Sequence, residues 1–332
     1  MSGTALDDCV DREMSGGAVV GLGLAAVGRP AYITPGRERD LGPSRSVEEL
    51  ESDARALLDA AYAAGVRYVD AARSYGLAER FLGGWLRDRP TSADVTVASK
   101  WGYAYVGGWC LDAAVHEVKD HGVGAYEAQL VETRAELSRL PDVYHVHSLT
   151  PDSPALTDRV LHRRLAALRA SGTAVGFSTS GPRQADVVRR ALELEVDGTR
   201  LFDVVQSTWN VLEPSAGPAL AEARAAGLRV VVKEAMANGR LVGVEADPAP
   251  GVAAVLRLAE ELSVSPDQVA VRAALAQPWA SVVLSGTVTP DQLRSNVGAT
   301  TVDLPPGWVG SVLAEREEPE TYWRERSQRA WT

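Results

Sequence analysis

Short valine-rich runs alternate with longer segments of helical period along most of this sequence, and no other feature limits its fold as strongly. In the longer segments apolar residues recur every three or four positions, whereas the short runs have the length and composition of buried strands. This alternation is typical of parallel strands joined by crossover helices. Eight candidate strands follow, at residues 19–22, 67–70, 95–100, 143–147, 174–178, 202–206, 229–233 and 281–284. Eight strands favour a closed (β/α)8 TIM barrel of the α/β class over an open sheet.

The chain length agrees with a single barrel domain. An α/β barrel is one unit of roughly 250 residues plus insertions, and this chain has 332 residues. We expect a flexible N-terminal extension over residues 1–17 and one barrel over residues 18–332, with long loops at the carboxyl face of the strands. The extension is acidic and lacks both the basic region and the apolar region of a signal peptide.

Charge and cysteine content narrow the functional class. The net charge of −10 argues against a nucleic-acid surface, which requires a basic stripe to displace counterions from phosphates. No apolar run reaches the ~20 residues of a membrane span, so no membrane partner is expected. The two cysteines, Cys9 and Cys110, form neither a disulfide framework nor a metal set, which fits a reducing cytoplasm.

Three segments break the alternation of strands and helices. They are residues 29–46, residues 101–124 and the tail from about residue 303, and we expect all three to be loops. In a barrel the segments after the first and third strands lie at the carboxyl face, where active sites are built. The alternative, surface insertions without a function, stays open for each of them.

Helix starts are marked between the strands. Ser46 and Glu49 form a capping-box pattern, and a capping hydroxyl followed by a proline and an amide recurs at residues 265–268 and 289–292. These patterns predict structure and imply no chemistry.

Reactive side chains gather at the predicted ends of neighbouring strands. Asp70 ends the second strand and Lys100 ends the third, where strand alternation points Lys100 into the barrel. A buried lysine needs a partner, and Asp70 is the obvious one. An isolated pair of this kind could be an ordinary buried ion pair. Tyr75 changes this interpretation, because an adjacent ammonium favours the phenolate and lowers the pKa of a phenol from about 10.

A histidine pair occupies the fourth strand, where His145 and His147 share one face. Such a pair could belong to a zinc site, but the other histidines, His116, His121 and His162, fall in loops or helices. We therefore expect no metal, with His147 at the active face and His145 as a filled interior position.

A glycine run at residues 21–26 nominally matches a dinucleotide-binding fingerprint. The fingerprint must open a helix, whereas Gly28 and Pro30 follow at once. Gly23 is better explained by close approach of the backbone to a ligand, or by a turn.

Together these residues resemble the aldo-keto reductase family over about residues 18–300. The most specific stretch is residues 65–76 with Glu79, which is similar to the family signature after the second strand. Residues 98–100 and 142–147 resemble the family's lysine and histidine motifs. The resemblance implies four catalytic residues: Asp70, Tyr75, Lys100 and His147.

The resemblance also implies a nicotinamide cofactor, with NADP(H) preferred and NAD(H) as the other candidate. Ser178 and Gln206 would hold the carboxamide while Trp209 stacks on the ring, although Trp209 replaces the usual tyrosine and Thr179 the usual asparagine. Glu234 stands where other members have a serine near the pyrophosphate, and Arg240 could compensate for it. The implied cofactor residues are Gly23, Ser178, Thr179, Gln206, Trp209, Met236, Arg240, Gly286, Thr287, Gln292, Arg294 and Asn296.

The implied function is reversible reduction of an aldehyde or ketone to an alcohol. Tyr75 would donate the proton, tuned by Lys100, while His147 polarises the carbonyl. The partner is a small carbonyl substrate, and the oligomeric state is left open. A second hypothesis is a cofactor-binding regulatory or sensor subunit with little turnover, similar to potassium-channel β subunits. Candidate walls of the substrate pocket are Trp101, Tyr103, Trp109 and Trp308.

Overall fold

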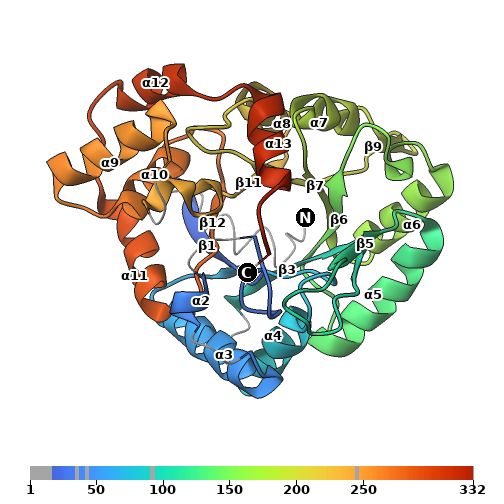
Figure 1. Cartoon of the computed structure of the whole chain (residues 1–332). Helices are drawn as coiled ribbons and strands as arrows, with labels where there is room; N and C mark the ends of the chain where they lie inside the picture. The colour runs from blue at the N-terminus through green and yellow to red at the C-terminus, as the bar shows by residue number, and fades with distance from the viewer. Residues whose placement is uncertain (1–16, 34–36, 42–44, 90–93, 244–246, 332) are drawn as a thin grey trace.

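A closed parallel barrel forms the centre of the protein. The computed structural model describes residues 17–33, 37–41, 45–89, 94–243 and 247–331. Within these ranges eight strands close into the order β1-β12-β11-β10-β7-β6-β3-β2. Figure 1 shows this barrel surrounded by helices. All of the predicted strands are confirmed: β1 (Val19–Gly23), β2 (Tyr68–Asp70), β3 (Thr96–Trp101), β6 (Val143–Leu149), β7 (Ala174–Thr179), β10 (Val204–Thr208), β11 (Arg229–Lys233) and β12 (Val282–Ser285). Most of the expected N-terminal extension lies outside the described residues, so that boundary stays a prediction.

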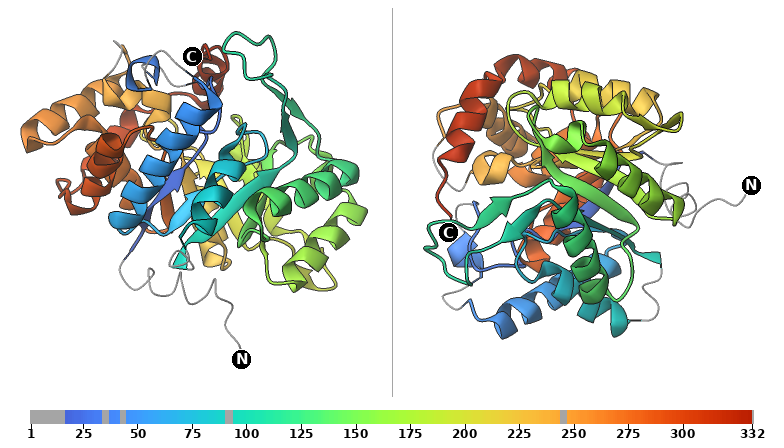
Figure 2. Two further views of the ribbon diagram at one scale, coloured as in Figure 1. Left: turned by 90° about the horizontal axis from the view of Figure 1, so that it is seen from below. Right: turned by 90° about the vertical axis from the view of Figure 1, so that its right-hand side faces the viewer.

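Helices cover the outside of the barrel, as the two views of Figure 2 show. The expected capping box at the start of α3 is present, because the Ser46 hydroxyl accepts a hydrogen bond from the Glu49 amide at 3.2 Å. No helix within the described ranges combines the length and apolar character needed to cross a membrane. The main outer helices are α3 (Val47–Ala63), α4 (Ala78–Arg87), α5 (Val123–Leu137), α6 (Arg159–Ala170), α7 (Gln184–Leu192), α8 (Gly217–Ala225), α9 (Pro250–Leu262), α10 (Pro266–Leu275) and α11 (Pro290–Gly298).

Apolar side chains fill the barrel and the layer between barrel and helices. Inside, a cluster of buried residues includes Tyr68, Val143, Val204 and Leu284, one from each of four strands. Because side chains alternate along a strand, the remaining positions face the helices and form the outer layer of the core. Because the eight strands of the barrel run parallel, their carboxyl ends lie at the same rim.

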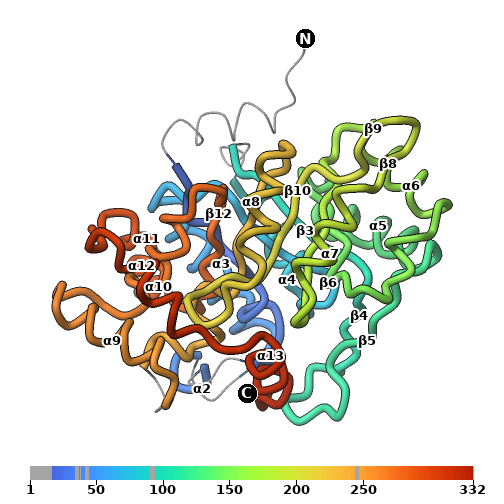
Figure 3. The backbone as a smooth tube through the Cα atoms, turned by 90° about the horizontal axis from the view of Figure 1, so that it is seen from above, coloured from blue at the N-terminus to red at the C-terminus, as the bar shows by residue number. Residues whose placement is uncertain are grey.

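The three irregular segments are not loops throughout, so that expectation was partly wrong. The first contains α2 (Arg37–Asp40), and the second contains an antiparallel hairpin of β4 (Tyr103–Tyr105) and β5 (Glu117–Lys119). The tail contains α12 (Trp308–Val312) and α13 (Pro319–Ser327). These elements have three to nine residues, too few for a clear hydrophobic period. Figure 3 shows α2, α13 and the hairpin at the same end of the barrel.

The remaining short elements are β8 (Glu195–Val196), β9 (Thr199–Arg200), η2 (Pro154–Leu156), η3 (Ala237–Val242), η4 (Ala299–Thr301) and η5 (Leu313–Glu315).

Candidate active site

The four side chains predicted to be catalytic lie together at the carboxyl ends of β2, β3 and β6. Lys100 Nζ forms an ion pair with Asp70 Oδ2 and donates a hydrogen bond to the Tyr75 hydroxyl at 3.2 Å. The Tyr75 and His147 rings meet edge to face, with centroids 5.6 Å apart. Asp70 ends β2 and Lys100 is the second-to-last residue of the adjacent β3, so the barrel itself brings them together.

Tyr75 is held by the turn that follows β2. The Ala71 amide bonds to the Ala98 carbonyl at 2.9 Å and the Arg73 amide to the Lys100 carbonyl at 3.0 Å, which extends the pairing with β3 beyond the end of β2. The Tyr75 amide then bonds to the Ala72 carbonyl at 3.0 Å and closes the turn. This path places the phenol above Lys100.

The Asp70 carboxylate has a second donor on the far side of the barrel. Gln206 Nε2 donates to Asp70 Oδ1 at 2.9 Å, while Oδ2 is paired with Lys100. The amide oxygen of Gln206 is buried and has no hydrogen-bond partner among the described residues. That oxygen is an acceptor available to a ligand with an N–H group.

Burial sets the protonation states of the phenol and the imidazole. Burial and Asp70 raise the pKa of Tyr75 well above its usual value, while Arg29 lowers it. The sequence predicted that Lys100 would lower the pKa of Tyr75, but in the structure this pKa is raised overall. The hydrogen bond from Lys100 still favours the phenolate. Tyr75 is therefore a protonated phenol at neutral pH. Burial also lowers the pKa of His147 well below its usual value, with Lys100 and Lys233 adding to the effect, so its imidazole is neutral.

A cavity of about 300 Å³ opens above these side chains. Its volume is at the lower end of the usual range for ligand pockets. The predicted site residues that line it are Gly23, Asp70, Tyr75, Tyr103, His147, Gln206, Met236 and Gly286. Lys100 lies behind Asp70 and Tyr75 and is fully buried.

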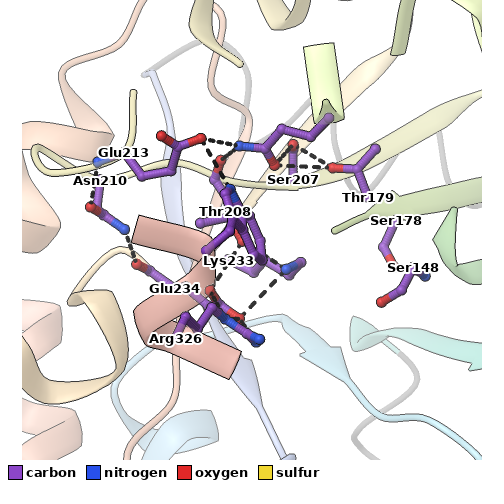
Figure 4. A network of polar contacts seen from close by, with 12 residues as sticks. Ser148, Ser178, Thr179, Ser207, Thr208, Asn210, Glu213, Lys233, Glu234 and Arg326 are labelled. Carbon is purple, nitrogen blue, oxygen red and sulfur yellow. Dashed lines mark hydrogen bonds and ion pairs between the residues drawn. The ribbon is translucent and has the colours of Figure 1, made fainter. Parts of the chain in front are cut away.

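Three residues predicted to hold the nicotinamide are buried away from the cavity. The Ser178 hydroxyl accepts from the Ser148 amide at 2.7 Å, and the Thr179 hydroxyl lies 2.6 Å from that of Ser207, as Figure 4 shows. Trp209 packs edge-on against Trp279, with ring centroids 5.8 Å apart in the outer core. The Ser178 side chain is connected to the cavity through Ser148, which lines it.

Residues predicted for the adenosine end are engaged in local contacts. Asn296 accepts from the Ser285 hydroxyl at 2.8 Å, and Thr287 accepts from the same hydroxyl at 3.2 Å. Gln292 donates to Asp40 of α2 at 2.7 Å, and Arg294 forms an exposed ion pair with Asp291.

Arg240 is tied to acidic side chains outside the cavity. It bonds to Asp247 at 2.6 Å and to Glu317 at 2.8 Å. Its charge is therefore balanced within the protein.

Of the four predicted pocket walls, Tyr103 lines the cavity, with its ring centroid 5.1 Å from that of His147. Trp101 is fully buried beneath the hairpin beside Tyr126. Trp109 donates its indole N–H to the Arg45 carbonyl at 2.7 Å, and Trp308 packs in α12 against the C-terminal core.

A charged network at the end of β11 was only partly foreseen. Arg326 of α13 forms a bidentate ion pair with Glu234, and its Nε lies 2.9 Å from Oε2. Lys233 Nζ donates to the Thr208 hydroxyl at 2.7 Å and lies 3.6 Å from Glu234 (Figure 4). Burial would raise the pKa of Glu234, but Arg326 and Lys233 lower it to about 2. The sequence marked Glu234 as unusual, whereas nothing marked its partner Arg326.

Four further cavity residues carried no sequence signal. Arg29 and Tyr32 come from the segment after β1, Glu117 from the hairpin and Trp331 from the tail. The sequence placed these segments at the active face but did not indicate which side chains enter the cavity.

Metal-binding side chains do not cluster among the described residues. Within the described ranges no group of three or more His, Cys, Asp or Glu side chains is placed to hold a metal ion. His145 is fully buried and packs against Gly176, where a Cβ would overlap its ring.

Comparisons with known proteins identify the family and the fold. The model of the Aldo/keto reductase family matches residues 44–312. The aldo-keto reductase str7 of Strobilurus tenacellus is 26% identical, covering 90% of this chain and 92% of that protein. Two solved structures superpose with a TM-score of 0.67 and cover 90% of this chain and 92% of theirs: the holo form of aldo-keto reductase AKR11C1 from Bacillus halodurans, 20% identical, and glycerol dehydrogenase AKR11B4 from Gluconobacter oxydans, 23% identical.

The chain belongs to the aldo-keto reductase family. It is an NAD(P)-dependent oxidoreductase of the carbonyl/alcohol class.

Proposed function

We propose that this chain reduces an aldehyde or ketone to an alcohol with NADP(H), in a reversible reaction with Tyr75 as the proton donor. The observation that carries the proposal is the grouping of a protonated phenol, a buried ammonium and a neutral imidazole around one cavity. When bound, the cofactor supplies the hydride.

Each of the four side chains has a distinct part in the proposed reaction. Tyr75 donates its hydroxyl proton to the carbonyl oxygen, and Lys100, 3.2 Å away, stabilises the phenolate that remains. Asp70 holds the Lys100 ammonium in place. Neutral His147 donates a hydrogen bond to the carbonyl oxygen and orients it toward Tyr75.

The residues of the cavity fit the nicotinamide end of the cofactor. The unpaired Gln206 oxygen can accept a hydrogen bond from the carboxamide. Gly23 and Gly286 line the cavity, and no atom would crowd a Cβ at Gly286, so the backbone there is open to a ligand.

The choice between NADP(H) and NAD(H) depends on cationic side chains that could meet the 2′-phosphate. We propose NADP(H) over NAD(H) because exposed Arg294 is the nearest predicted contact for a 2′-phosphate. Lys233 and Arg326 line the cavity and would hold the pyrophosphate of either cofactor. Arg240 is paired with Asp247 and Glu317 and is not available to bind a phosphate.

We also propose a cytoplasmic location, supported by the exposed free thiol of Cys110.

Consumption of NADPH with 4-nitrobenzaldehyde tests the proposal. We expect Tyr75→Phe to lower kcat/KM by about 10²- to 10⁴-fold, the usual contribution of general acid catalysis. The matched control is Tyr126→Phe, which removes the hydroxyl of a mostly buried tyrosine beside Trp101 that does not line the cavity, and it should stay within about threefold of the wild type. Quenching of tryptophan fluorescence should show that Tyr75→Phe still binds NADPH.

Cofactor binding without a loss of turnover in Tyr75→Phe would support a sensor subunit. If the wild type and Tyr75→Phe both bind NADPH and consume it equally slowly with every carbonyl tested, the enzyme proposal fails.

A further inference from the structure

A buried arginine lies beside the proposed proton donor and has no part in the proposed proton transfer. Arg29 is 2% exposed and lines the cavity. Its guanidinium carbon lies 5.2 Å from the centroid of the Tyr75 ring. The backbone fixes this proximity, because Gly28 packs directly against the Tyr75 turn and the Leu77 amide bonds to the Gly28 carbonyl at 2.7 Å.

Two aromatic rings hold the guanidinium in a defined orientation. Its central carbon lies 5.1 Å from the ring centroid of Tyr32 and 4.7 Å from that of Trp331. Trp331 in turn stacks on His116, with ring centroids 4.3 Å apart. Contacts of this kind favour a planar cation and limit its motion.

Among the described residues, only one nitrogen of Arg29 has a hydrogen-bond partner. Both of its hydrogen bonds to described residues leave from Nη1, to the Ser74 carbonyl at 3.0 Å and to Glu117 at 2.5 Å. Nε is buried and has no hydrogen-bond partner within the described part of the chain. The edge formed by Nε and Nη2 is thus left for another acceptor, and this edge matches the two oxygens of a carboxylate.

The positive charge of Arg29 acts on the reacting groups despite the ion pair with Glu117. It lowers the pKa of Tyr75 against the larger effects of burial and Asp70, and it adds to the burial that lowers the pKa of His147. A negative group on a substrate would therefore be attracted to the side of the cavity that holds the proton donor.

We propose that Arg29 is a specificity residue that binds a carboxylate of the substrate, so that the preferred substrates are carbonyl compounds carrying a carboxylate a few bonds from the reacting carbonyl. The spacing supports this, since the guanidinium is in direct contact with the Tyr75 ring, 5.2 Å from carbon to centroid, so a carboxylate bound to Arg29 lies only a few bonds from a carbonyl at the Tyr75 hydroxyl. A flat carboxylate also suits a cavity of about 300 Å³ with aromatic walls. The inference rests on the proposed reductase function and extends it to a substrate class.

Two series of benzaldehydes test the inference, because a nitro group and a carboxylate have nearly the same size and differ in charge. The ratio of kcat/KM for carboxybenzaldehyde over nitrobenzaldehyde is measured for the 2-, 3- and 4-isomers. We expect the wild type to favour the carboxylate by tenfold or more for at least one isomer. Arg29→Met should reduce that ratio to about one or below. Arg189→Met, which removes an exposed arginine paired with Glu222 on the outside of the barrel, should leave the ratio unchanged.

Two further variants separate recognition from structure. Arg29→Lys keeps the charge but not the planar edge, so the ratio should fall at least threefold even where the variant folds as the wild type does. Glu117→Gln removes the competing carboxylate, and we expect the ratio to rise above that of the wild type. A purely structural Arg29 would change both aldehydes alike and leave the ratio constant in all variants, which would overturn the inference.

Binding distinguishes failure of this inference from failure of the proposed function. Calorimetry without cofactor compares 4-formylbenzoate with its methyl ester in the wild type and Arg29→Met. If neither aldehyde is reduced but the carboxylate binds tenfold more tightly through Arg29, the reductase proposal fails and the carboxylate site stands. If nitrobenzaldehyde is reduced and no isomer shows a carboxylate preference in turnover or in binding, the carboxylate site is excluded while the reductase remains.

Discussion

Two ion pairs at the same rim of the barrel differ in what holds them. Asp70 and Lys100 lie near the ends of neighbouring strands, because Asp70 pairs with Ala98 in the register of β2 and β3 and Lys100 follows two residues later on the same face. Glu234 follows β11, but its partner Arg326 is 92 residues further along, in α13 of the tail. The first pair is a property of the barrel, whereas the second exists only when the tail docks.

The two ion pairs also differ in how exposed their side chains are to solvent. The side chains of Lys100 and Asp70 are 0% and 3% exposed, against 21% and 8% for Arg326 and Glu234. Removing one partner from a fully buried pair leaves an uncompensated charge, while a partly exposed partner can be replaced by water. We therefore expect the barrel pair to be costly to break and the tail pair to be adjustable.

The largest effect is expected for Lys100→Met, which strands the buried Asp70 carboxylate. Such a change typically costs about 3–5 kcal/mol of folding free energy. Activity should be lost together with stability, as measured by urea unfolding and NADPH consumption. The double variant Asp70→Asn/Lys100→Met should be more stable than Lys100→Met alone, and a double variant that is less stable would show that charge burial is not the cause.

Acid should weaken the tail pair in a defined pH range. The pKa of Glu234 is about 2 in the folded protein, below its ordinary value of 4.5, so its stabilisation is fully present above about pH 5 and is lost as the pH falls toward 2. The shift corresponds to a loss on the order of 3 kcal/mol. Urea unfolding between pH 3 and 7 should show a flatter profile for Glu234→Gln than for the control Glu222→Gln, which removes an exposed partner of Arg189. Equal profiles would contradict the assignment.

A smaller and local effect is expected for Arg326→Met. Glu234 keeps Lys233 as a partner, so we expect a loss of about 1–3 kcal/mol, the cost of leaving a charged group short of a hydrogen-bond partner. Hydrogen exchange should speed up in residues 319–327 and stay unchanged in β2 and β3. Faster exchange throughout the barrel would show that the tail and the barrel unfold as one unit.

The smallest effect tests a single anchor of the tail. Tyr322 accepts a hydrogen bond from Asn210 Nδ2 at 3.0 Å inside the C-terminal core. Tyr322→Phe should cost about 1 kcal/mol, because it leaves a buried amide without that acceptor. A thermal shift as large as that of Arg326→Met would mean that this hydrogen bond, rather than the ion pair, holds α13 in place.

The same contrast explains what the sequence could predict. All barrel strands and the meeting of Asp70, Lys100 and His147 follow from strand periodicity, since parallel strand ends must share a rim. Tyr75 lies in the turn after β2, and the resemblance to the family signature at residues 65–76 identified it. Arg326 could not be found in this way, because its position depends on how short tail elements dock onto the barrel.

Residues just past a strand end were also difficult to predict. Trp209 follows β10, where the alternation of side chains no longer applies, and its indole packs against Trp279. For Arg29 the sequence indicated the correct face but not the direction of the side chain, which is set by contacts with Glu117 and Trp331 from two distant segments.

The contact between Gly28 and the Tyr75 turn limits how this enzyme can be redesigned. A Cβ at Gly28 would overlap the Tyr75 carbonyl, and one at Gly76, where φ is +60°, would overlap the Gly28 carbonyl. Libraries that vary the segment after β1 to alter substrate choice should therefore keep both glycines. A methyl group at either one would displace the acid together with its neighbour, and the resulting loss of turnover would be misread as a change of specificity.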